Sequence, residues 1–400
     1  MSDIAIIGGG AAGMMCALAL KLNNSKINVT VFERMPKVLK KVAVTGNGKC
    51  NITNNRAIAS DYFEAKNFVI PSLSEFTPQS NIDFFKHIGI LCVTEEEGRV
   101  YPSSRSAQSV VKALDNKAIL MGVKVLTDTA VNSIKSENNK YILNNELDFD
   151  AVVIACGGKA APKFGTDGSS YELLKGLGHK IVNPIPALTA LNAKDFPHSL
   201  KGVRALCDVT LLIDGKNIFS ETGEVQFTDY GLSGIPIMQL SRFVSKSRSS
   251  DIKILLDCLP DFSLNEVREL LLSVNDEISS EDAVGGILPR QLGNYITSKC
   301  DIKKDTPFSK ISDSKRILLA KAIKSLKAEI TSARDFEFAQ VTAGGAELSE
   351  FDEITMESKL RKGLFAVGEV LDVDGPCGGY NLQWAWSSAR TAAKQIVKEY

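Results

Sequence analysis

Short apolar runs alternate with amphipathic segments along roughly the first 185 of the 400 residues. Runs at 3–8, 28–33 and 150–156 have the length and apolar content of buried strands, and segments of helical texture lie between them. Strands that alternate with helices are typical of a sheet with parallel strands. This part of the chain therefore predicts an α/β fold, and the same texture returns from about residue 336.

The texture changes near Pro184, where short strand-like segments replace the alternation of strands and helices. Asp214-Gly215 and Thr222-Gly223 are dipeptides of the kind found in tight turns between such segments. These features predict a β-rich module.

A second change follows Pro260. Ser263 and Glu266 have the S-x-x-E spacing of a helix capping box, and helical texture continues after them. We expect four segments: a first part of the sheet domain at 1–186, a β-rich substrate module at 187–260, a helical module at 261–335, and a return to the sheet domain at 336–400.

The first apolar run leads into a glycine-rich turn, IAIIGGGAAG, and the second ends in Glu33. Gly8 permits a tight turn from strand to helix, Gly10 lets the backbone approach a pyrophosphate, and Gly13 lets the helix pack closely on the sheet. Glu33 can accept hydrogen bonds from ribose hydroxyls and would repel a 2′-phosphate. The pattern predicts a site for FAD or NAD.

The C-terminal segment LFAVGEVLDVDGPCGGYNLQWAWSS favours FAD over NAD. It has a short strand, a turn rich in glycine and a helix, and so provides a second segment for the flavin half of a long cofactor. A helix that begins between Gly379 and Leu382 would direct its positive end at the flavin and stabilise negative charge there.

The segment from Lys41 to Asn54 is a polar loop that contains glycine, asparagine and threonine. Such a loop can wrap a cofactor, because glycine permits close backbone approach and the polar side chains offer donors and acceptors. Read by itself, the segment is equally compatible with a solvated turn.

Six segments together resemble one family: GGGAAG (8–13), KVAVTGNGKCNITN (41–54), GRVYPSS (98–104), ACGGKAAPKFGTDGSSYELLKGLGH (155–179), GEVQFTDYGLSG (223–234) and the C-terminal segment above. The chain resembles the HI0933-like family of FAD-dependent oxidoreductases, which includes flavoproteins of the aminoacetone oxidase type. The resemblance implies a discontinuous Rossmann-like FAD-binding domain of the GR2 type, interrupted by a β-barrel-like module and a small helical module. The family usually has arginine at the position of Lys49 and often histidine at that of Asp229.

The motifs and the resemblance together predict the residues that contact FAD. They are Gly8, Gly10, Ala11, Ala12, Gly13, Glu33, Arg34, Lys41, Thr45, Gly46, Asn47, Gly48, Cys50, Asn51, Val131, Gly157, Gly158, Gly368, Glu369, Asp372, Gly378, Gly379, Asn381, Leu382 and Gln383.

Candidates for catalysis are few. Tyr380, beside two glycines of the C-terminal turn, is the residue that we expect to orient substrate or donate a proton, although a packed aromatic ring is an equal alternative. Cys50 and Cys377 have no paired cysteine nearby, which favours a buried thiol over a catalytic one. The eight cysteines contain no C-x-x-C pattern and the three histidines form no constellation, so no metal site is expected.

Charge and hydropathy limit the partners. Lysine plus arginine and aspartate plus glutamate number 47 each, which argues against binding driven by nucleic-acid phosphates. No apolar run approaches the roughly 18 residues of a membrane span. The chain enters a strand almost at once, so we expect no signal peptide. We expect a cytoplasmic protein with a small-molecule substrate. The oligomeric state does not follow from the sequence.

Only one dinucleotide fingerprint is present, so NADH or NADPH would bind transiently if either is the electron donor. Two enzyme schemes follow. In one, an amine oxidase passes hydride from its substrate to flavin N5; in the other, a reductase takes electrons from a nicotinamide and saturates an unsaturated bond. A third interpretation is a flavoprotein that modifies or binds RNA, against which the balanced charge counts.

Overall fold

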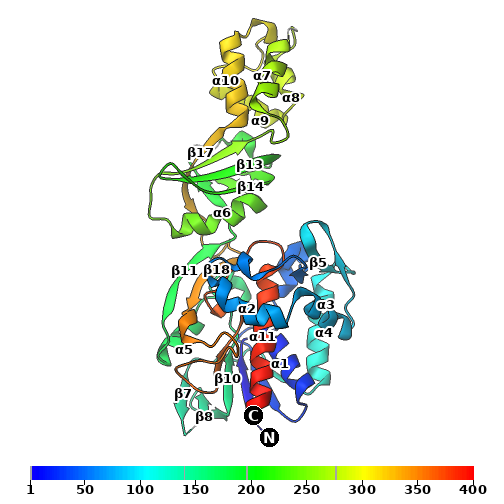
Figure 1. Ribbon diagram of the computed structural model, residues 1–400, viewed down its shortest axis with the longest axis vertical. Helices are drawn as coiled ribbons and strands as arrows, with labels where there is room; N and C mark the ends of the chain where they lie inside the picture. The colour runs from blue at the N-terminus through cyan, green and yellow to red at the C-terminus, as the bar shows by residue number, and fades with distance from the viewer. Residues whose placement is uncertain (1, 139, 195–196, 275–276) are drawn as a thin grey trace. The chain divides into compact units, whose positions relative to one another are not determined.

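The computed structural model describes residues 2–138, 140–194, 197–274 and 277–400. The chain forms two compact units (Figure 1). Unit 1 comprises Met1–Ile185 and Gln340–Tyr400, and unit 2 comprises Pro186–Ala339. The predicted architecture, a Rossmann-like domain interrupted by a barrel and several helices, is confirmed.

Unit 1 is built on a five-stranded parallel sheet in the order β19-β10-β1-β2-β6. Its strands are almost entirely apolar at the centre, because helices or loops cover both faces of such a sheet. The strands are β1 (Asp3–Ile7), β2 (Asn28–Phe32), β6 (Lys124–Leu126), β10 (Ala151–Ile154) and β19 (Leu364–Ala366).

Helix α1 (Ala11–Asn23) follows β1 directly and packs beside α11 (Tyr380–Glu399), the last helix of the chain (Figure 1). Most of α1 is buried, from Ala12 to Leu20, and this is why its sequence is apolar on all sides. The remaining α-helices of unit 1 are α2 (Lys66–Glu75), α3 (Pro78–His87), α4 (Ala107–Leu120) and α5 (Ser170–Gly176).

Three smaller sheets complete unit 1. They consist of β3 (Thr53–Asn54), β5 (Arg99–Pro102) and β4 (Cys92–Thr94); of β7 (Ile134–Glu137), β8 (Lys140–Leu143) and β9 (Leu147–Phe149); and of β11 (Ile181–Ala187) with β18 (Val341–Ala346). Short 3₁₀ segments of the chain are η1 (Val42–Gly48), η2 (Ala59–Ala65), η3 (Glu96–Gly98), η4 (Pro162–Phe164), η5 (His198–Leu200), η6 (Phe308–Lys310), η7 (Leu348–Glu350) and η8 (Gly368–Val370).

Unit 2 contains a closed six-stranded barrel in the order β12-β15-β14-β13-β16-β17. Its strands are β12 (Leu191–Ala193), β13 (Arg204–Ile213), β14 (Lys216–Phe227), β15 (Gly231–Ser233), β16 (Ile252–Asp257) and β17 (Leu326–Ala333), and α6 (Ile235–Lys246) packs against β14. The other helices are α7 (Leu264–Ser273), α8 (Ser280–Gly285), α9 (Arg290–Lys299) and α10 (Asp313–Lys324).

The predicted capping box is present at the start of α7. The Ser263 hydroxyl accepts from the Glu266 N–H at 3.2 Å, and the Glu266 carboxylate accepts from the Ser263 N–H at 2.7 Å. The turn predicted at Asp214-Gly215 joins β13 to β14, and both residues have positive φ.

Two local predictions were wrong. Thr222-Gly223 is not a turn but lies within β14, where the missing side chain of Gly223 leaves room for Pro236 of α6. Helical texture was expected to continue to residue 335, yet residues 326–333 form barrel strand β17. Buried Leu326, Ala328 and Ile330 alternate there with exposed residues, a period of two that the preceding helical pattern obscured.

None of the helices in the described part of the chain combines the length and apolarity that a membrane crossing needs.

Candidate functional site

The turn between β1 and α1 shows three different uses of glycine. Gly8 has φ +106°, and a Cβ there would lie 2.6 Å from the Ala155 carbonyl oxygen. A Cβ on Gly13 would lie 1.9 Å from the Gly8 carbonyl oxygen, so the helix packs directly on the turn. A Cβ on Gly10 would meet no protein atom within 4 Å. Gly8 and Gly13 serve the fold, whereas Gly10 borders open space at the helix N-terminus.

Ala11 and Ala12 form the first turn of α1, and Ala12 is buried against Gly368 of η8. Gly368 has φ +73°, and its N–H donates to the Ser388 hydroxyl of α11 at 3.0 Å. The beginning of α1 is thus held close to the turn that follows β19.

Glu33 ends β2 and is 9% exposed. One carboxylate oxygen accepts from the Gly9 N–H and the other from the Met35 N–H, both at 2.8 Å. These two bonds fix the carboxylate beside the glycine turn. Because each oxygen of a carboxylate can accept more than one hydrogen bond, capacity remains for ribose hydroxyls.

Arg34 follows Glu33 directly in the sequence, and Val131 belongs to a segment that is hydrogen-bonded to the Glu33 backbone. Arg34 forms an exposed ion pair with Asp167 at 2.7 Å and donates to Ser169 at 3.0 Å. Val131 follows β6 in a segment whose Thr129 N–H donates to the Glu33 carbonyl at 2.9 Å. Arg34 is therefore committed to the loop before α5.

A network links residues more than 300 positions apart in the sequence. The Lys41 ammonium is 2.9 Å from one oxygen of Glu369, and the other oxygen of Glu369 accepts from the Thr342 N–H at 2.8 Å. The Thr342 hydroxyl in turn accepts from the N–H groups of Lys159 and Ala160 at 2.8 and 3.0 Å. Sequence reasoning assigned Lys41 and Glu369 to the cofactor but missed Thr342, a buried residue of β18.

Two glycines follow β10 at this network. Gly157 has φ +72°, and a Cβ on Gly158 would lie 2.4 Å from the Thr342 hydroxyl oxygen. Asp372 lies nearby along the C-terminal segment and accepts from the Gly344 N–H at 2.8 Å. Glycine is required at 158 so that the strand end can reach Thr342.

Tyr171 of α5 was not predicted from the sequence. Its ring is 4% exposed, and its buried hydroxyl has no hydrogen-bond partner among the described residues. Burial raises the pKa of Tyr171, and the negative charges of Glu369 and Asp372 raise it further. A buried hydroxyl without a hydrogen-bond partner, close to two carboxylates of the site, can form its missing hydrogen bond with a bound ligand.

The loop around Thr45–Asn51 has a strained backbone. Gly46, Asn47, Gly48 and Cys50 have φ values of +56°, +54°, +82° and +59°. The Cys50 N–H donates to the Thr45 carbonyl at 3.0 Å, and the Thr45 hydroxyl donates to the Val42 carbonyl at 2.8 Å. Left-handed backbone at non-glycine residues is costly and is found preferentially at ligand sites.

The side chains of this loop divide into buried and exposed ones. Cys50 is fully buried, and burial raises the pKa of its thiol to about 12, which keeps it protonated. Asn51 is 8% exposed, and its side-chain oxygen has no hydrogen-bond partner among the described residues. Lys49, where the family usually has arginine, is exposed.

The unpartnered oxygen of Asn51 lies at the start of α11. A Cβ on Gly379 would be 2.9 Å from this oxygen and 2.5 Å from the Thr53 carbonyl oxygen, so only glycine fits there, at φ +104°. Gly378 is held by its carbonyl, which accepts from Asn54 at 3.1 Å. Helix α11 has no side-chain cap and no acidic residue in its first turn, which leaves its N–H groups available to a ligand.

Three further residues that the sequence predicts as FAD contacts lie in the first turn of α11. The side chains of two of them form hydrogen bonds within the protein. The Asn381 amide exchanges hydrogen bonds of 2.9 Å with the backbone of Gly375. Gln383 is fully buried, and its side chain bonds Thr53, Phe76 and Ser387. Leu382 packs partly against the core. The amide side chains of Asn381 and Gln383 therefore brace the turn and the helix; direct contact of these residues with a cofactor stays a prediction.

Aromatic residues gather at the same end of α11. The Tyr62 hydroxyl donates to the Tyr380 carbonyl at 2.8 Å. Burial raises the pKa of the half-buried Tyr380, with Asp61 raising it further and Arg56 lowering it. Burial also raises the pKa of Tyr101, whose ring would lie 3.2 Å from a Cβ on Gly46. Both hydroxyls are protonated at neutral pH.

The histidines do not join this site. His179 is buried, with one ring nitrogen 3.1 Å from Glu350 and the other 3.0 Å from the Ser358 hydroxyl, and it stacks on Phe351. It lies just beyond the end of α5, and its two bonds brace the segment before β19. In unit 2, Asp229, where the family often has histidine, pairs with Lys201 at 2.7 Å.

A family model described as HI0933-like protein Rossmann domain matches residues 2–395. The chain is 34% identical to a 3-dehydro-bile acid delta(4,6)-reductase of Clostridium scindens over the whole length of both chains. It is 28% identical to a ribosomal RNA dihydrouridine synthase of Haemophilus influenzae, with 100% of this chain and 99% of the other covered.

Among solved structures, one similar fold is that of the 3-ketosteroid delta1-dehydrogenase from Sterolibacterium denitrificans. The TM-score is 0.53 at 14% identity, and both chains are covered completely. At this identity the likeness concerns the fold alone.

Proposed function

Because the chain belongs to the HI0933-like family of FAD-dependent oxidoreductases, we propose that it reduces a carbon–carbon double bond conjugated with a carbonyl group. The observation that carries this proposal is the full-length similarity to two proteins named for such reductions. A delta(4,6)-reductase saturates carbon–carbon bonds, and dihydrouridine differs from uridine by two added hydrogens. An amine oxidase reaction has no counterpart in these two names.

The residues of unit 1 fit FAD on three observations. A Cβ on Gly10 would have no protein atom within 4 Å, and this open space suits a pyrophosphate at the N-terminus of α1. Glu33 keeps free acceptor capacity for a ribose, and the Lys41–Glu369 pair would contact the middle part of FAD. The unpartnered oxygen of Asn51 and the uncapped start of α11 would hold the flavin end.

FAD, when bound, supplies the hydride at N5. The protein's own task is to polarise the carbonyl group, position the double bond and provide the second hydrogen as a proton. The hydride adds to the β-carbon and the proton to the α-carbon, so that two hydrogens are gained. Tyr380 is our candidate for the proton donor, because it begins α11 directly after the glycine turn and its hydroxyl carries a proton at neutral pH.

The electron donor in this proposal is NADH or NADPH. The sequence contains a single dinucleotide fingerprint, which FAD takes in this proposal, so the nicotinamide would bind transiently. The reduction of the flavin by the nicotinamide and its reoxidation by the acceptor can each be measured separately.

Anaerobic stopped-flow absorbance near the flavin band tests the proposal. We expect NADH or NADPH to bleach the flavin, an α,β-unsaturated ketone to restore it, and oxygen to restore it slowly. Bleaching by small amines with fast recovery in oxygen and release of peroxide would contradict the proposal and indicate an oxidase.

A second candidate substrate is a uracil ring within RNA. It is favoured by the ribosomal RNA dihydrouridine synthase of Haemophilus influenzae, which this chain matches over its full length. Incubation of the reduced protein with unmodified ribosomal RNA, followed by mass spectrometry of nucleosides, would detect a gain of two hydrogens. If small ketones turn over and RNA does not, this candidate is wrong.

A further inference from the structure

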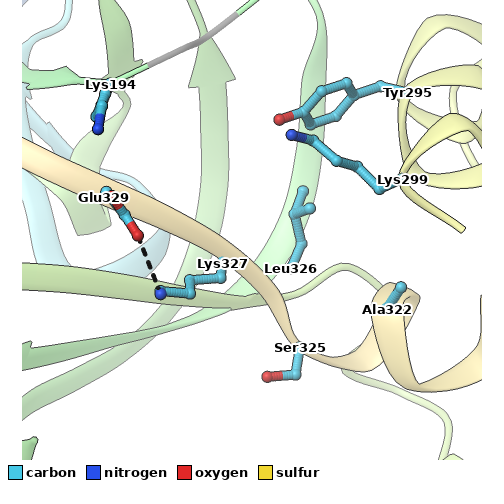
Figure 2. Close-up of a pocket in the computed structure, with 8 residues that line it drawn as sticks. All are labelled: Lys194, Tyr295, Lys299, Ala322, Ser325, Leu326, Lys327 and Glu329. Carbon is cyan, nitrogen blue, oxygen red and sulfur yellow. Dashed lines mark hydrogen bonds and ion pairs between the residues drawn. The ribbon is translucent and has the colours of Figure 1, made fainter. Parts of the chain in front are cut away.

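Unit 2 contains a groove of about 380 Å³ between the barrel and helix α9 (Figure 2). We call it the lysine groove and define it by Lys194, Tyr295, Lys299, Lys327 and Glu329. Lys194 follows β12, Lys327 and Glu329 lie on β17, and Tyr295 and Lys299 lie on α9. The barrel and the helical segment thus both contribute cations to it.

Positive charge exceeds negative charge in the lysine groove. Glu329 is the one carboxylate of the five defining residues, and Lys327 pairs with it at 3.1 Å. Neither Lys194 nor Lys299 has an ion pair within the described ranges. Lys327 holds the pKa of Glu329 below its usual value, and Lys194 and Lys253 lower it further, as expected where cations dominate.

Helix ends account for only part of this charge. Lys299 is the last residue of α9, where a cation complements the helix dipole. Lys194 and Lys327 are on the barrel side and gain nothing from that dipole. Both act on Glu329, whose pKa they lower, and together with Lys299 they line one groove that a shared anionic ligand would fit.

An aromatic ring accompanies the cations. Tyr295 is half-buried, and the Lys299 ammonium lies 5.3 Å from the centre of its ring. Figure 2 shows the Tyr295 hydroxyl and the Lys299 ammonium extending from α9 into the same side of the groove. A ring beside several exposed ammonium groups is the combination by which proteins hold a single nucleic-acid strand: charges contact phosphates, and a base stacks on the ring.

We propose that the lysine groove binds a single-stranded segment of RNA, with Lys194, Lys299 and Lys327 contacting phosphates and Tyr295 stacking on a base. The three lysines are exposed, which suits the outside of a passing strand better than an enclosed small anion. The inference rests on the RNA substrate given above as the second candidate. It names the part of unit 2 that would hold that substrate.

The test uses fluorescence anisotropy of the full-length holoprotein with a short fluorescein-labelled oligouridine at several salt concentrations. One variant combines Lys194→Gln, Lys299→Gln and Lys327→Gln. The matched control combines Lys216→Gln, Arg248→Gln and Lys310→Gln, which removes the same charge from exposed positions of unit 2 outside the groove.

Three phosphate contacts contribute roughly 2 to the salt slope for a single strand, which corresponds to about twentyfold in affinity between about 50 and about 200 mM salt. We expect the groove variant to lose that part of the salt dependence and the control to keep it. Tyr295→Ala should weaken binding by roughly 5- to 150-fold, while Tyr295→Phe should retain it.

The proposal is overturned if the wild-type protein does not bind the oligouridine at low salt, if both charge variants lose the same affinity, or if Tyr295→Ala binds as the wild type does. Flavin reoxidation by a small unsaturated ketone is measured on the same preparations. Normal ketone reduction with no RNA binding contradicts the groove alone; RNA binding with no reduction of any acceptor contradicts the proposed function alone.

Discussion

Replacement of Gly10 by alanine should separate cofactor binding from folding. The Gly10 backbone has φ −79° and ψ −165°, a conformation open to alanine, and the added Cβ would meet no protein atom within 4 Å. Such a substitution stabilises a folded chain by about 0.4–1 kcal/mol through the unfolded state. For a unit of this size that amounts to a rise of roughly 1–4 °C in the melting temperature of the apoprotein.

The same methyl group should interfere with FAD. It would occupy the side of the turn that a pyrophosphate must approach, and a lost backbone hydrogen bond to a charged group costs about 1.5–3 kcal/mol. We therefore expect a loss of roughly 10- to 150-fold in FAD affinity. The assay is a titration of apoprotein with FAD, followed by quenching of flavin fluorescence, together with a thermal melt of each apoprotein.

Gly13→Ala is the matched control. Its Cβ would lie 1.9 Å from the Gly8 carbonyl oxygen, so it should destabilise the apoprotein by at least about 3 kcal/mol, the upper end for overpacked cores. If Gly10→Ala bound FAD as tightly as the wild type, the placement of the pyrophosphate would be wrong. If it lowered the melting temperature of the apoprotein, Gly10 would serve the fold instead.

Three other perturbations test the rest of unit 1. Glu33→Gln should cost about 1–3 kcal/mol in unfolding free energy and weaken FAD binding, because an NH₂ group would face a backbone N–H. Unchanged urea unfolding together with full flavin occupancy would contradict this. Tyr380→Phe should slow reoxidation of the flavin by an unsaturated ketone by about 10²–10⁴ and leave reduction of the flavin by NADH intact. Tyr101→Phe is the control, and an equal effect of both substitutions would exclude Tyr380 as the proton donor. Burial lowers the folded-state pKa of His179 below 6.5, so the unfolding free energy should rise with pH between that lowered value and 6.5. In urea titrations at several pH values, His179→Gln should flatten this dependence.

The sequence was informative wherever one residue type answers a local need. The glycines of the first turn, the acid after the second strand and the capping box at Ser263 are properties of neighbouring residues, and the structure places them as expected. The strand Leu326–Ala333 was missed because it follows a helix without a break in polarity. Its period of two is short, and its pairing with β16 and β12 is what establishes it as a strand.

Contacts between distant segments could not be derived from local pattern. Lys41 and Glu369 were both assigned to the cofactor, but nothing in the sequence pairs them with each other or with Thr342. Likewise, Gln383 was assigned to the cofactor, but nothing in the sequence pairs its side chain with Thr53. The topology of the fold determines which residues become partners, and this topology cannot be read from the local sequence pattern.

The first turns of α11 explain why tryptophan follows the glycine turn so closely. The Trp384 indole N–H donates to the Gly368 carbonyl at 3.1 Å, and the Trp386 indole N–H donates to the Ile52 carbonyl at 2.8 Å. Both rings are buried, so each bond is protected from water. The two bonds tie the helix to the turn after β19 and to the loop that ends in Asn51. The helix N-terminus is thereby fixed in place before any ligand arrives, and a fixed dipole stabilises developing negative charge without reorganisation.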